Sequence, residues 1–521
     1  MVTGYVIRKN EYYDSVFLMR VAKRLSEQKG ILQTAALMGT EKNKALLEEI
    51  DVRGPEILEA TPSDLIVAVK ADSQESLTFV MENIGQWLNP ALGPGVASAI
   101  RTLDEAVAMR PHSNLAVISV PGSYAAREAR KALEHGLNVF LFSDNVPVES
   151  EISLKEYARE RGLIVMGPDC GTAIIGGIGI GFANAVRHGP IGVIGASGTG
   201  IQEFTSLVHR AGSGISHAIG IGSRDLSDAV AGISFLSALD ALVADKQTEV
   251  ITILSKPPGE RALSTLIPRI LNCRKPIVVC FLGLKQDSPH AGFHPRMART
   301  LDDAAALALQ IVGANPPPPF HANSATIRTL LQRERAGKNP EQKYIRGIFA
   351  GGTFCFQAQQ ILQEGGVVVR SNAPLYGNLR LADPMTSEEH TLVDTGTDDF
   401  TVGKPHPMID SRLRRDRILA EGRDPQVAIL LLDFVLGFNS SPDPAGELVF
   451  SIEEAKGEAK KRSGSLSVVA SICGTEGDPQ IFPHQVEILE KAGVVLFPSS
   501  AQAAQFCALL AAGLSEAKGV K

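Results

Sequence analysis

The sequence, of 521 residues, lacks most of the features that assign a chain to a specialised class of protein. Aromatic residues make up only 5% of it and the net charge is −6, so composition gives no reason to expect binding to nucleic acid or to an anionic membrane. No apolar run is long enough to span a membrane, and the first residues lack the apolar core of a secretion signal. We therefore expect a cytoplasmic protein with no nucleic-acid or membrane partner.

Cysteine is also scarce and unpatterned. The chain has six cysteines, none in a C-x-x-C pair and none near a histidine at metal-ligand spacing. They are Cys170, Cys273, Cys280, Cys355, Cys473 and Cys507. This scatter predicts reduced thiols rather than a disulfide framework or a zinc site, and we expect no metal site.

Glycine, by contrast, is abundant, with 49 residues, and short apolar runs alternate with helical patterns along the chain. Strands that alternate with helices predict parallel sheets, with ligands at the carboxyl ends of the strands. We expect a multidomain α/β protein, because 521 residues are too many for one core. The expected segments are a small α+β domain over 1–95, doubly wound parallel-sheet units over 96–187, 188–314 and 344–521, and a stiff, extended, proline-rich linker over 315–343.

The stretch IGVIGASGTGIQEF, from Ile191 to Phe204, is the most informative part of the chain. It predicts a buried strand, a loop of small residues and the start of a helix. Such a loop aims backbone N–H groups and a helix amino end at one point, which suits a phosphate, an acyl phosphate or a carboxylate. The loop has no Gly-Lys-Ser/Thr of a P-loop, and a tight turn that only allows close packing is the alternative. The candidate anion-binding residues are Gly195, Ser197, Gly198, Thr199 and Gly200.

Later strand ends offer further candidates of the same kind. Two more loops supply possible anion-binding residues, Gly351, Gly352 and Thr353 in one and Gly474 and Thr475 in the other. Arg224, in GIGSRD, offers a bidentate clamp for a carboxylate or a phosphate, with a surface turn beside Asp225 as the alternative. Each of these assignments places a small anion at the carboxyl end of a strand.

A long polar run and three single residues complete the candidates. The run from 394 to 410 is either a loop that binds substrate or a divalent ion or a solvated interdomain loop, and it holds Asp398, Asp399, Lys404 and His406. His290 is either a phosphoryl carrier or a surface-loop residue. Asp169 and Cys170 end a strand at an expected ligand-binding edge and are candidate substrate-binding residues. Cys170 is either a nucleophile or, because no base is predicted beside it, a small packing residue.

Taken in order, several motifs resemble succinyl-CoA synthetase. The runs GPDCGTAIIGG, IGVIGASGTG and HAIGIGSRD resemble its α subunit, and AGGT, LVDTGTDDF, LLLDFVLG and ICGTEGD resemble the carboxy-terminal domain of its β subunit. The fused arrangement, with MGPDCGT, SKPP, FTVGKPHPMID and GTEGDPQ, resembles the FdrA family over nearly the whole chain. The resemblance implies a CoA-binding-like Rossmann domain over 96–187 and flavodoxin-type domains of the synthetase type over 188–314 and 344–521.

The sequence departs from the synthetase in the parts that use ATP and CoA. No segment of it supplies an ATP-grasp domain, and residues 1–113 have no counterpart of the glycine loop that holds CoA. The context of the synthetase phosphohistidine is reduced to His290 in PHAG, and the glutamate that orients that histidine falls at Lys256, with reversed charge. The departures imply an anion-binding scaffold in which Lys256 is a catalytic cation that neutralises a phosphate.

The FdrA resemblance implies a function in purine and allantoin breakdown, as one subunit of an oxamate carbamoyltransferase. That activity exchanges carbamoyl phosphate and oxamate with oxalurate and phosphate. The implied ligands are small anions (a carbamoyl or acyl phosphate and an oxamate-like carboxylate), and the implied partners are other protein subunits. Two alternatives are an acyl-CoA synthetase that uses His290 as phosphoryl carrier and a non-catalytic scaffold or regulatory subunit. No cofactor is certain, since CoA or a nucleotide is expected only for the synthetase alternative.

Overall fold

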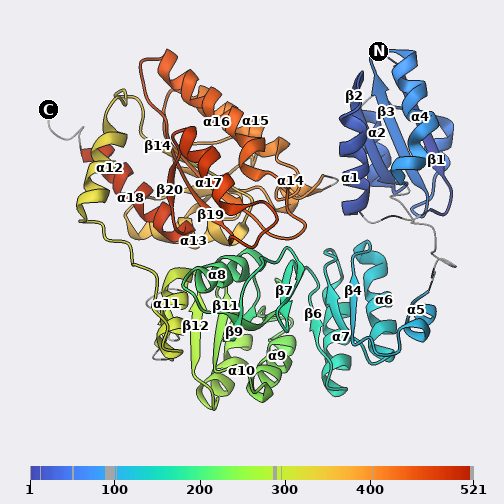
Figure 1. Cartoon of the computed structure of the whole chain (residues 1–521), viewed down its shortest axis with the longest axis horizontal. Helices are drawn as coiled ribbons and strands as arrows, with labels where there is room; N and C mark the ends of the chain where they lie inside the picture. Colours follow the sequence, from blue (N-terminus) through green and yellow to red (C-terminus); the bar gives the residue numbers. More distant parts are fainter. Residues whose placement is uncertain are drawn as a thin grey trace. The chain divides into compact units, whose positions relative to one another are not determined.

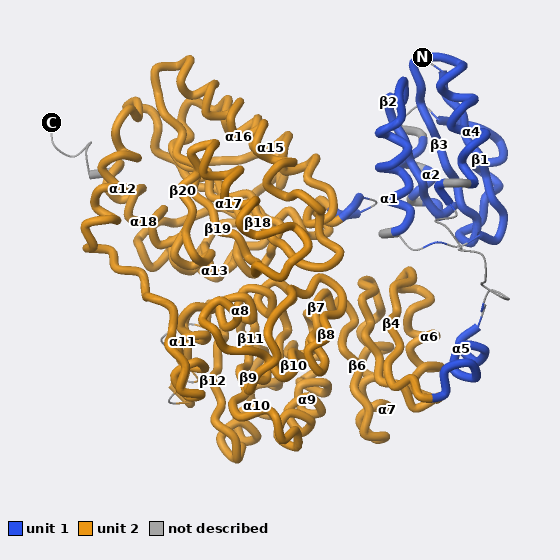
Figure 2. The backbone as a smooth tube through the Cα atoms, in the orientation of Figure 1, with its two compact units in different colours: residues 1–111, 401–405 blue, residues 112–400, 406–521 orange. Residues whose placement is uncertain are grey.

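The computed structural model describes residues 2–11, 13, 15–49, 52–88, 100, 102–284, 290, 292–294, 296–402 and 404–516. They belong to two compact units, one of residues 1–111 with 401–405 and one of residues 112–400 with 406–521 (Figure 2). The expected boundary between residues 95 and 96 lies outside the described residues. Helices and strands alternate through both units, which confirms the mixed α/β class expected from the sequence.

The smaller unit is built on a three-stranded antiparallel sheet of order β1-β3-β2. Its elements are β1 (Val2–Arg8), α1 (Ser15–Ser26), β2 (Ile31–Met38), α2 (Glu41–Glu49), α3 (Pro55–Glu59), β3 (Leu65–Ala71), α4 (Gln74–Leu88) and α5 (Leu103–Met109). Successive residues of the central strand point to opposite faces. Leu65 and Val67 pack in one apolar cluster with residues of α1 and α4, and Ile66 packs in a second with residues of α2 and α3. Helices therefore cover both faces of this sheet.

The larger unit begins with a small parallel sheet of order β4-β5-β6. Its elements are β4 (Leu115–Ile118), α6 (Gly122–Glu134), β5 (Asn138–Leu141), α7 (Val148–Glu160) and β6 (Val165–Met166). The strand–helix alternation predicted this parallel pairing. Its three strands form a separate small sheet, beside two much larger ones in the same unit.

The first large sheet has seven strands in the order β13-β12-β11-β9-β10-β7-β8 and, with its helices, forms the first lobe. Its strands are β7 (Thr172–Ile175), β8 (Ile178–Gly181), β9 (His188–Gly195), β10 (Ile215–Gly220), β11 (Val250–Ser255), β12 (Ile277–Phe281) and β13 (Met297–Ala298). Its helices are α8 (Gly198–Arg210), α9 (Ile233–Ala244), α10 (Glu260–Leu271) and α11 (Leu301–Ile311). β7 and β8 form a hairpin that pairs antiparallel with β10, so residues 172–181 extend the sheet of the segment expected to begin at 188.

The second large sheet is parallel throughout, in the order β16-β15-β17-β14-β18-β19-β20, and forms the second lobe. Its strands are β14 (Tyr344–Phe349), β15 (Arg370–Ser371), β16 (Leu379–Arg380), β17 (Thr391–Asp394), β18 (Val427–Val435), β19 (Ser467–Cys473) and β20 (Val495–Phe497). Its helices are α13 (Gly352–Glu364), α14 (Asp398–Thr401), α15 (Arg412–Arg423), α16 (Pro444–Lys461), α17 (Phe482–Lys491) and α18 (Ser500–Glu516). The interior strand β18 is buried along its whole length, as helix cover on both faces requires.

The segment expected to be an extended linker contains a helix, α12 (Ala325–Arg335). The hydroxyl of Ser324 caps it by accepting the N–H of Ile327 at 3.2 Å. Ile327, Leu330 and Leu331 are spaced along one helix face and pack against the large apolar core. The sequence did not predict this helix, because its apolar stripe is short and stands in a polar segment that follows the prolines at 316–319.

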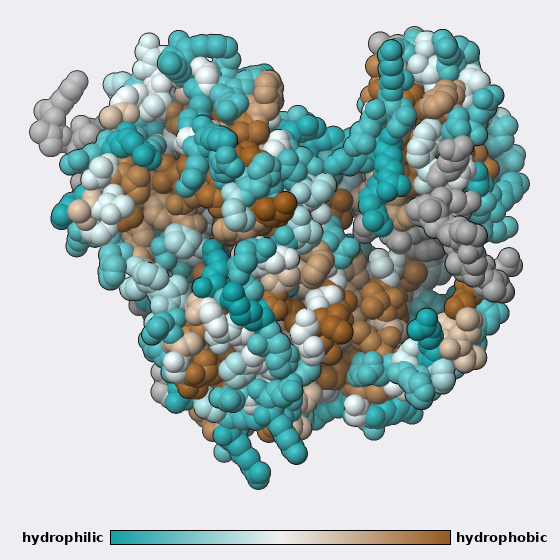
Figure 3. Space-filling view, viewed as in Figure 1, coloured by the Kyte–Doolittle hydropathy of each residue, from teal (hydrophilic) through white to brown (hydrophobic). Residues whose placement is uncertain are grey.

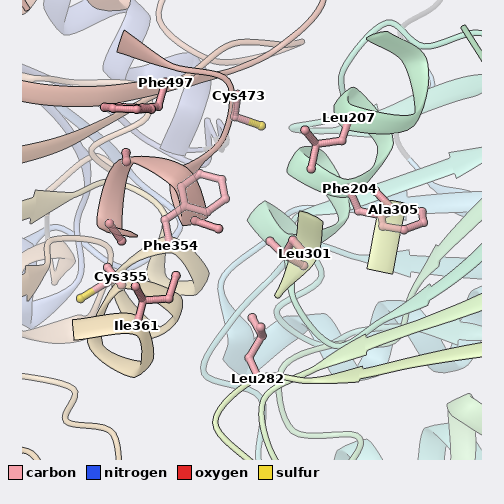
Figure 4. Close-up of a cluster of buried hydrophobic side chains, with 14 of the residues drawn as sticks. Phe204, Leu207, Leu282, Leu301, Ala305, Phe354, Cys355, Ile361, Cys473 and Phe497 are labelled. Atoms are coloured by element: carbon pink, nitrogen blue, oxygen red, sulfur yellow. The ribbon is translucent and has the colours of Figure 1, made fainter. Parts of the chain in front are cut away.

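The two lobes share one apolar core. Its residues come from α8 and α11 of the first lobe and from α13, β19 and β20 of the second. Figure 4 shows Phe204 and Leu301 on the side of the first lobe facing Phe354 and Ile361 of the second. Because a shared core of buried side chains ties the lobes together, loops at their contact are held in a fixed relation to each other.

The surface of the larger unit carries apolar side chains in several patches among polar ones in the view of Figure 3. Among the described residues, large exposed side chains such as Phe450 and Tyr376 occur on separate elements, which is ordinary for a folded protein. None of the helices in the described part of the chain is both long and apolar enough to cross a membrane.

Candidate functional site

The two glycine loops predicted as separate anion sites meet in the structure. Ser197 caps α8, its Oγ accepting the N–H of Gly200 at 3.1 Å, and it also forms a hydrogen bond with the hydroxyl of Thr353 in the first turn of α13. A Cβ on Gly351 would lie 3.1 Å from Cγ2 of Thr199, and one on Gly200 would lie 3.3 Å from Cγ2 of Thr353. The amino ends of α8 and α13 are therefore in contact across the lobes (Figure 1).

This contact joins two positive helix ends. Each helix has 13 residues and follows the carboxyl end of a parallel strand, β9 for α8 and β14 for α13. The free N–H groups of a first turn, together with the helix dipole, favour an anion at that end. Because glycines line the contact, no bulky side chain separates the two ends. The shared surface, which we call the paired helix ends, suits a phosphate or carboxylate group.

Lys256 supplies a cation beside the paired helix ends. It directly follows β11, the neighbour of β9, and the N–H of Ala196 donates to the carbonyl of Leu254 at 3.0 Å. The Lys256 ammonium lies 5.1 Å from the ring centroid of Phe356, in the first part of α13, and the side chain is exposed. The cation expected near the first glycine loop therefore also lies against the second one.

Asp394 is a buried carboxyl at the same place. It ends β17, is 7% exposed, and its Oδ1 accepts the N–H of Gly396 at 2.9 Å. A Cβ on Gly352 would lie 2.4 Å from its Oδ2, so the carboxyl lies against the first residue of α13. Burial raises the pKa of Asp394 to about 6, although the Lys256 ammonium and the Gly396 N–H act in the opposite direction. Sequence reasoning included Asp394 in a polar run but did not single it out.

The loop before α13 is fixed by a buried ion pair. The N–H groups of Ala350 and Gly351 donate to the two carboxylate oxygens of Asp433 at 2.9 and 2.7 Å. Arg414 donates to the same carboxylate at 2.7 Å, and both side chains are almost fully buried. Asp433 and Arg414 therefore position the amino end of α13, and no pattern in the sequence predicts their pairing.

Three of the predicted anion-binding glycines also serve close packing, the alternative that the sequence left open. A Cβ on Gly195 would lie 2.5 Å from Cγ1 of Ile201, and one on Gly198 would lie 3.2 Å from Oγ1 of Thr172. Gly352 makes room for Asp394, as described above. Anion binding and packing are compatible roles, because a loop must be compact to bring its N–H groups together.

Gly474 and Thr475 belong to a loop that is hydrogen-bonded to the other lobe. The Thr475 hydroxyl donates to the carbonyl of Ala185 at 2.6 Å, and its N–H donates to Asp478 at 2.8 Å. Asp478 also accepts hydrogen bonds from the Asn184 side chain and the Ala185 N–H, at 2.8 and 2.7 Å. The polar groups of this loop are thus engaged with protein, and the structure gives them a role in holding β19 of the second lobe to the segment before β9.

Arg224 and Cys170 are likewise engaged by the protein. Arg224 donates to the carbonyl of Val146 at 2.7 Å and pairs with Glu151 at 2.9 Å, so its guanidinium holds two internal groups. Burial raises the pKa of the Cys170 thiol to about 12, so the protonated thiol predominates at neutral pH, which favours the packing alternative over a nucleophile. Asp169 remains exposed, and desolvation by the surrounding protein raises its pKa.

His290 has a carboxylate partner that the sequence did not single out. Its Nε2 lies 3.1 Å from Oε2 of Glu260, the first residue of α10. Its neighbours Pro289 and Ala291 lie outside the described residues. The contact places His290 at the amino end of α10.

The polar run from 394 to 410 contains the short helix α14, where Asp399 accepts a hydrogen bond from the Asn372 side chain at 3.4 Å. His406 accepts the N–H of Met408 at Nδ1, at 3.2 Å, and burial lowers its pKa to about 4, so it is neutral at physiological pH. Lys404 is exposed. Within the described ranges, no group of three His, Cys, Asp or Glu residues is arranged to hold a metal ion.

The buried carboxyl of Glu203, in α8, should make the free energy of unfolding depend on pH. Its carboxylate accepts the N–H and hydroxyl of Ser500 at 2.6 and 2.5 Å, and burial raises its pKa to about 7, with Asp302 adding to the shift. A carboxyl whose folded pKa exceeds its unfolded value stabilises the fold at low pH and loses that contribution as pH rises towards 7. Glu203→Gln should therefore be more stable than wild type at pH 8 by about 2 kcal/mol and nearly equal at pH 5.

Denaturant unfolding followed by circular dichroism at pH 5, 6.5 and 8 measures this difference. Glu249→Gln, an exposed position, is the matched control and should follow wild type at each pH. A Glu203→Gln curve parallel to that of wild type at all three values would contradict the assignment.

Comparison with known proteins gives matches to all parts of the chain. A family model described as "AllF, heavy metal-associated domain" matches residues 1–98. A model described as "CoA binding domain" matches residues 186–283, and one described as "CoA-ligase" matches residues 348–510. The protein YahF of Escherichia coli (strain K12) is 42% identical over 505 residues, which cover 96% of this chain and 97% of YahF. The α subunit of an ADP-forming succinate–CoA ligase of Methanothermobacter thermautotrophicus is 31% identical over 157 residues, covering 29% of this chain and 52% of that subunit.

Among solved structures, a dinucleotide-forming acetyl-coenzyme A synthetase 1 of Ca. Korarchaeum cryptofilum aligns with 18% identity. The alignment covers 78% of this chain and 85% of that one, with a TM-score of 0.28. At that score the alignment adds nothing to the architecture, which rests on the strand orders given above.

The heavy metal-associated description does not fit the residues present. Soft metal ions are bound by cysteine thiolates and histidine imidazoles. Residues 1–98 contain neither cysteine nor histidine. The donor set therefore does not suit a heavy metal, and no metal is given a role.

The CoA binding model matches residues 186–283, in the first lobe, whereas the sequence predicted a CoA-binding-like domain over 96–187. The loops of the small parallel sheet in that predicted domain do not form a cradle for the phosphates of CoA. The segments after β4 and β5 contain no glycine-rich run. A Cβ on Gly122 would lie 2.3 Å from the carbonyl oxygen of Asp144, so that glycine is used to pack the two loops against each other.

Proposed function

Because this chain belongs to the FdrA-like family of YahF, which is related to succinate–CoA ligases, we propose that it is one subunit of a carbamoyl-transferring complex. The complex interconverts carbamoyl phosphate and oxamate with oxalurate and phosphate, in the breakdown of purines and allantoin. The observation that carries the proposal is the convergence of the amino ends of α8 and α13 beside Lys256. Two helix dipoles and one ammonium suit a small dianionic acyl phosphate.

In this proposal the paired helix ends bind the phosphate of carbamoyl phosphate. Its oxygens accept hydrogen bonds from the free N–H groups of the first turns, and from the hydroxyls of Ser197, Thr199 and Thr353. The bond between Ser197 and Thr353 in the present structure is the one that an incoming phosphate oxygen replaces. Binding therefore exchanges one neutral hydrogen bond for charge-assisted ones.

The transfer itself is attack by the oxamate amide nitrogen on the carbamoyl carbon, without a covalent enzyme intermediate. Negative charge builds up on the oxygen that links carbon to phosphorus as that bond breaks. The Lys256 ammonium stabilises this charge, which a glutamate at the same position would oppose. Arg224 is predicted to orient the oxamate carboxylate; Val146 and Glu151 contact one nitrogen of its guanidinium, and the side chain is partly exposed.

The test uses the full-length tagged chain together with the subunits that copurify with it from the native cells. Incubation with carbamoyl phosphate and oxamate should yield oxalurate and phosphate in equal amounts, without ATP or CoA. Absence of both products from a preparation that contains partner subunits would overturn the proposal. Product formation that is independent of the paired helix ends, judged by Gly200→Val, would show that this chain is only a scaffold.

The 31% identity to a succinate–CoA ligase α subunit favours a second candidate function, an acyl-CoA synthetase. In that case His290, held by Glu260, would carry a phosphoryl group. Incubation with labelled ATP distinguishes the two functions. An acid-labile protein label that disappears in His290→Ala supports the synthetase, and an unlabelled chain that still forms oxalurate supports the transferase.

A further inference from the structure

The carboxyl of Asp394 has an arrangement that phosphate binding alone does not explain. Its Oδ2 lies against Gly352 at the amino end of α13, where an anionic ligand is expected. No hydrogen bond to Oδ2 occurs among the described residues, whereas Oδ1 accepts the Gly396 N–H at 2.9 Å. A carboxylate that faces an anion site without a dedicated donor opposes ligand binding unless it gains a proton. A role that involves a proton would account for its presence there.

The groups around Asp394 act in opposite directions on whether its carboxyl is protonated or ionised. Lys256 faces it from the end of β11, and the carboxyls of Asp399 in α14 and Asp433 in β18 add negative charge. Nε2 of His406 and Oδ1 of Asp394 approach the same point, 2.8 and 3.2 Å from where a Cβ on Gly396 would lie. His406 is neutral, as shown above, so the only nearby cation among these groups is Lys256. Burial and the two carboxyls favour the protonated form of Asp394, and Lys256 favours the ionised form.

We propose that Asp394 is the catalytic residue that carries the proton during group transfer, from the attacking nitrogen to the leaving phosphate. This inference rests on the proposed function. The ionised carboxyl accepts the proton of the oxamate amide as the carbon–nitrogen bond forms. The carbon–oxygen bond to phosphate then breaks, the electron pair stays on the phosphate oxygen, and Asp394 returns the proton to the phosphate as HPO₄²⁻. One bond forms, one breaks and the residue ends in its starting state.

The location of Asp394 meets the requirements of this role. It lies against the helix end that binds phosphate. The positive charge of Lys256 favours the ionised form of Asp394, so the carboxyl gives up its proton after transfer. A carboxyl with a pKa of about 6 is ionised at pH 7.5 yet basic enough to hold a proton briefly. General acid–base catalysis of this kind contributes about 10²- to 10⁴-fold to a rate.

The first test is sulfate binding to the full-length chain, measured by calorimetry from pH 5 to pH 8. Sulfate is used because it does not titrate in this range. In wild type the ionised Asp394 repels sulfate, so affinity should rise about tenfold as pH falls through about 6. Asp394→Asn should bind sulfate at pH 8 as tightly as wild type does at pH 5, with little dependence on pH. Asp416→Asn, an exposed position in α15, is the matched control and should keep the wild-type dependence.

The second test is turnover in the copurified complex. Asp394→Asn should lower turnover about 100-fold or more while sulfate affinity is retained, and Asp394→Glu should restore part of the rate. The wild-type rate at low substrate should fall as pH drops through about 6, and the variant should lack that inflection. A residue with only a structural role would not change the pH profile in this way.

The outcomes separate this inference from the proposed function. If wild type does not bind sulfate, the anion site fails and the role of Asp394 fails with it. If wild type binds sulfate and the complex transfers carbamoyl groups, but Asp394→Asn keeps the wild-type pH dependence and rate, the role of Asp394 alone is overturned. Loss of the pH dependence together with loss of turnover supports both.

Discussion

Replacing Lys256 by alanine should lower turnover of the carbamoyl-transferring complex by about 100-fold or more. The ammonium lies beside the paired helix ends, where charge develops on the leaving phosphate, and loss of one donor at such a position commonly costs about 10²- to 10³-fold. Arginine keeps the charge but not the point-like ammonium, so Lys256→Arg should retain a reduced rate. Initial rates of oxalurate and phosphate formation measure the effect.

Lys246→Ala is the matched control for this prediction. Lys246 is exposed and precedes β11, whereas Lys256 follows it, so the two lysines flank opposite ends of the same strand. The control should change turnover less than twofold. Sulfate affinity of the isolated chain should fall in Lys256→Ala and stay unchanged in Lys246→Ala. Unaltered turnover in Lys256→Ala would remove Lys256 from the mechanism.

Replacing Arg414 by methionine should produce the largest loss of stability. The guanidinium pairs with Asp433 at 2.7 Å in a fully buried position, and Met leaves that carboxylate unpaired. Breaking a buried pair from one side costs about 3–5 kcal/mol in free energy of unfolding. Asp433 also accepts the N–H groups of Ala350 and Gly351, so the loop before α13 should loosen at the same time.

The single tryptophan of the chain makes this prediction easy to localise. Trp87 belongs to α4 in the smaller unit, so its fluorescence transition should not move in Arg414→Met. The transition followed by circular dichroism should shift to lower denaturant for the larger unit. Arg412→Met, an exposed position in the same helix, should shift neither signal by more than about 1 kcal/mol. Equal effects of the two arginine variants would show that the buried pair is not stabilising.

The sequence predicted the parts of the site better than their assembly. Strand, glycine loop and helix start follow from local patterns, and these patterns predict anion sites at the loops 195–200 and 351–353. Their meeting depends on how the two lobes pack, which is decided by a core of residues from both. Periodicity in a single chain carries no information about which face of one lobe contacts the other. The contact of Ser197 with Thr353 therefore had to come from the structure.

Asp394 and Asp433 show why functional carboxyls were missed. Each ends or lies within an apolar strand, in LVDTG and LLLDF, where a single acidic residue reads as part of the strand boundary. The distinguishing properties of Asp394 are its burial and the nearby charge of Lys256, and that of Asp433 is its pairing with Arg414. Lys256 lies 138 residues before Asp394, and Arg414 lies 19 residues before Asp433, beyond the reach of a local pattern. An isolated aspartate within an apolar run was the one available signal, because such a residue is costly to bury without a purpose.

The segment between α11 and β14 has a consequence for how the anion site is assembled. Ser197 and Thr353 are 156 residues apart in one chain, and the linking segment makes the encounter of their lobes intramolecular. A tether of this kind corresponds to an effective concentration of about millimolar or above. The two halves of the site are therefore always present in equal number, and dilution of the protein cannot separate them. Affinity for a small anion is set by the site alone, with no contribution from protein concentration.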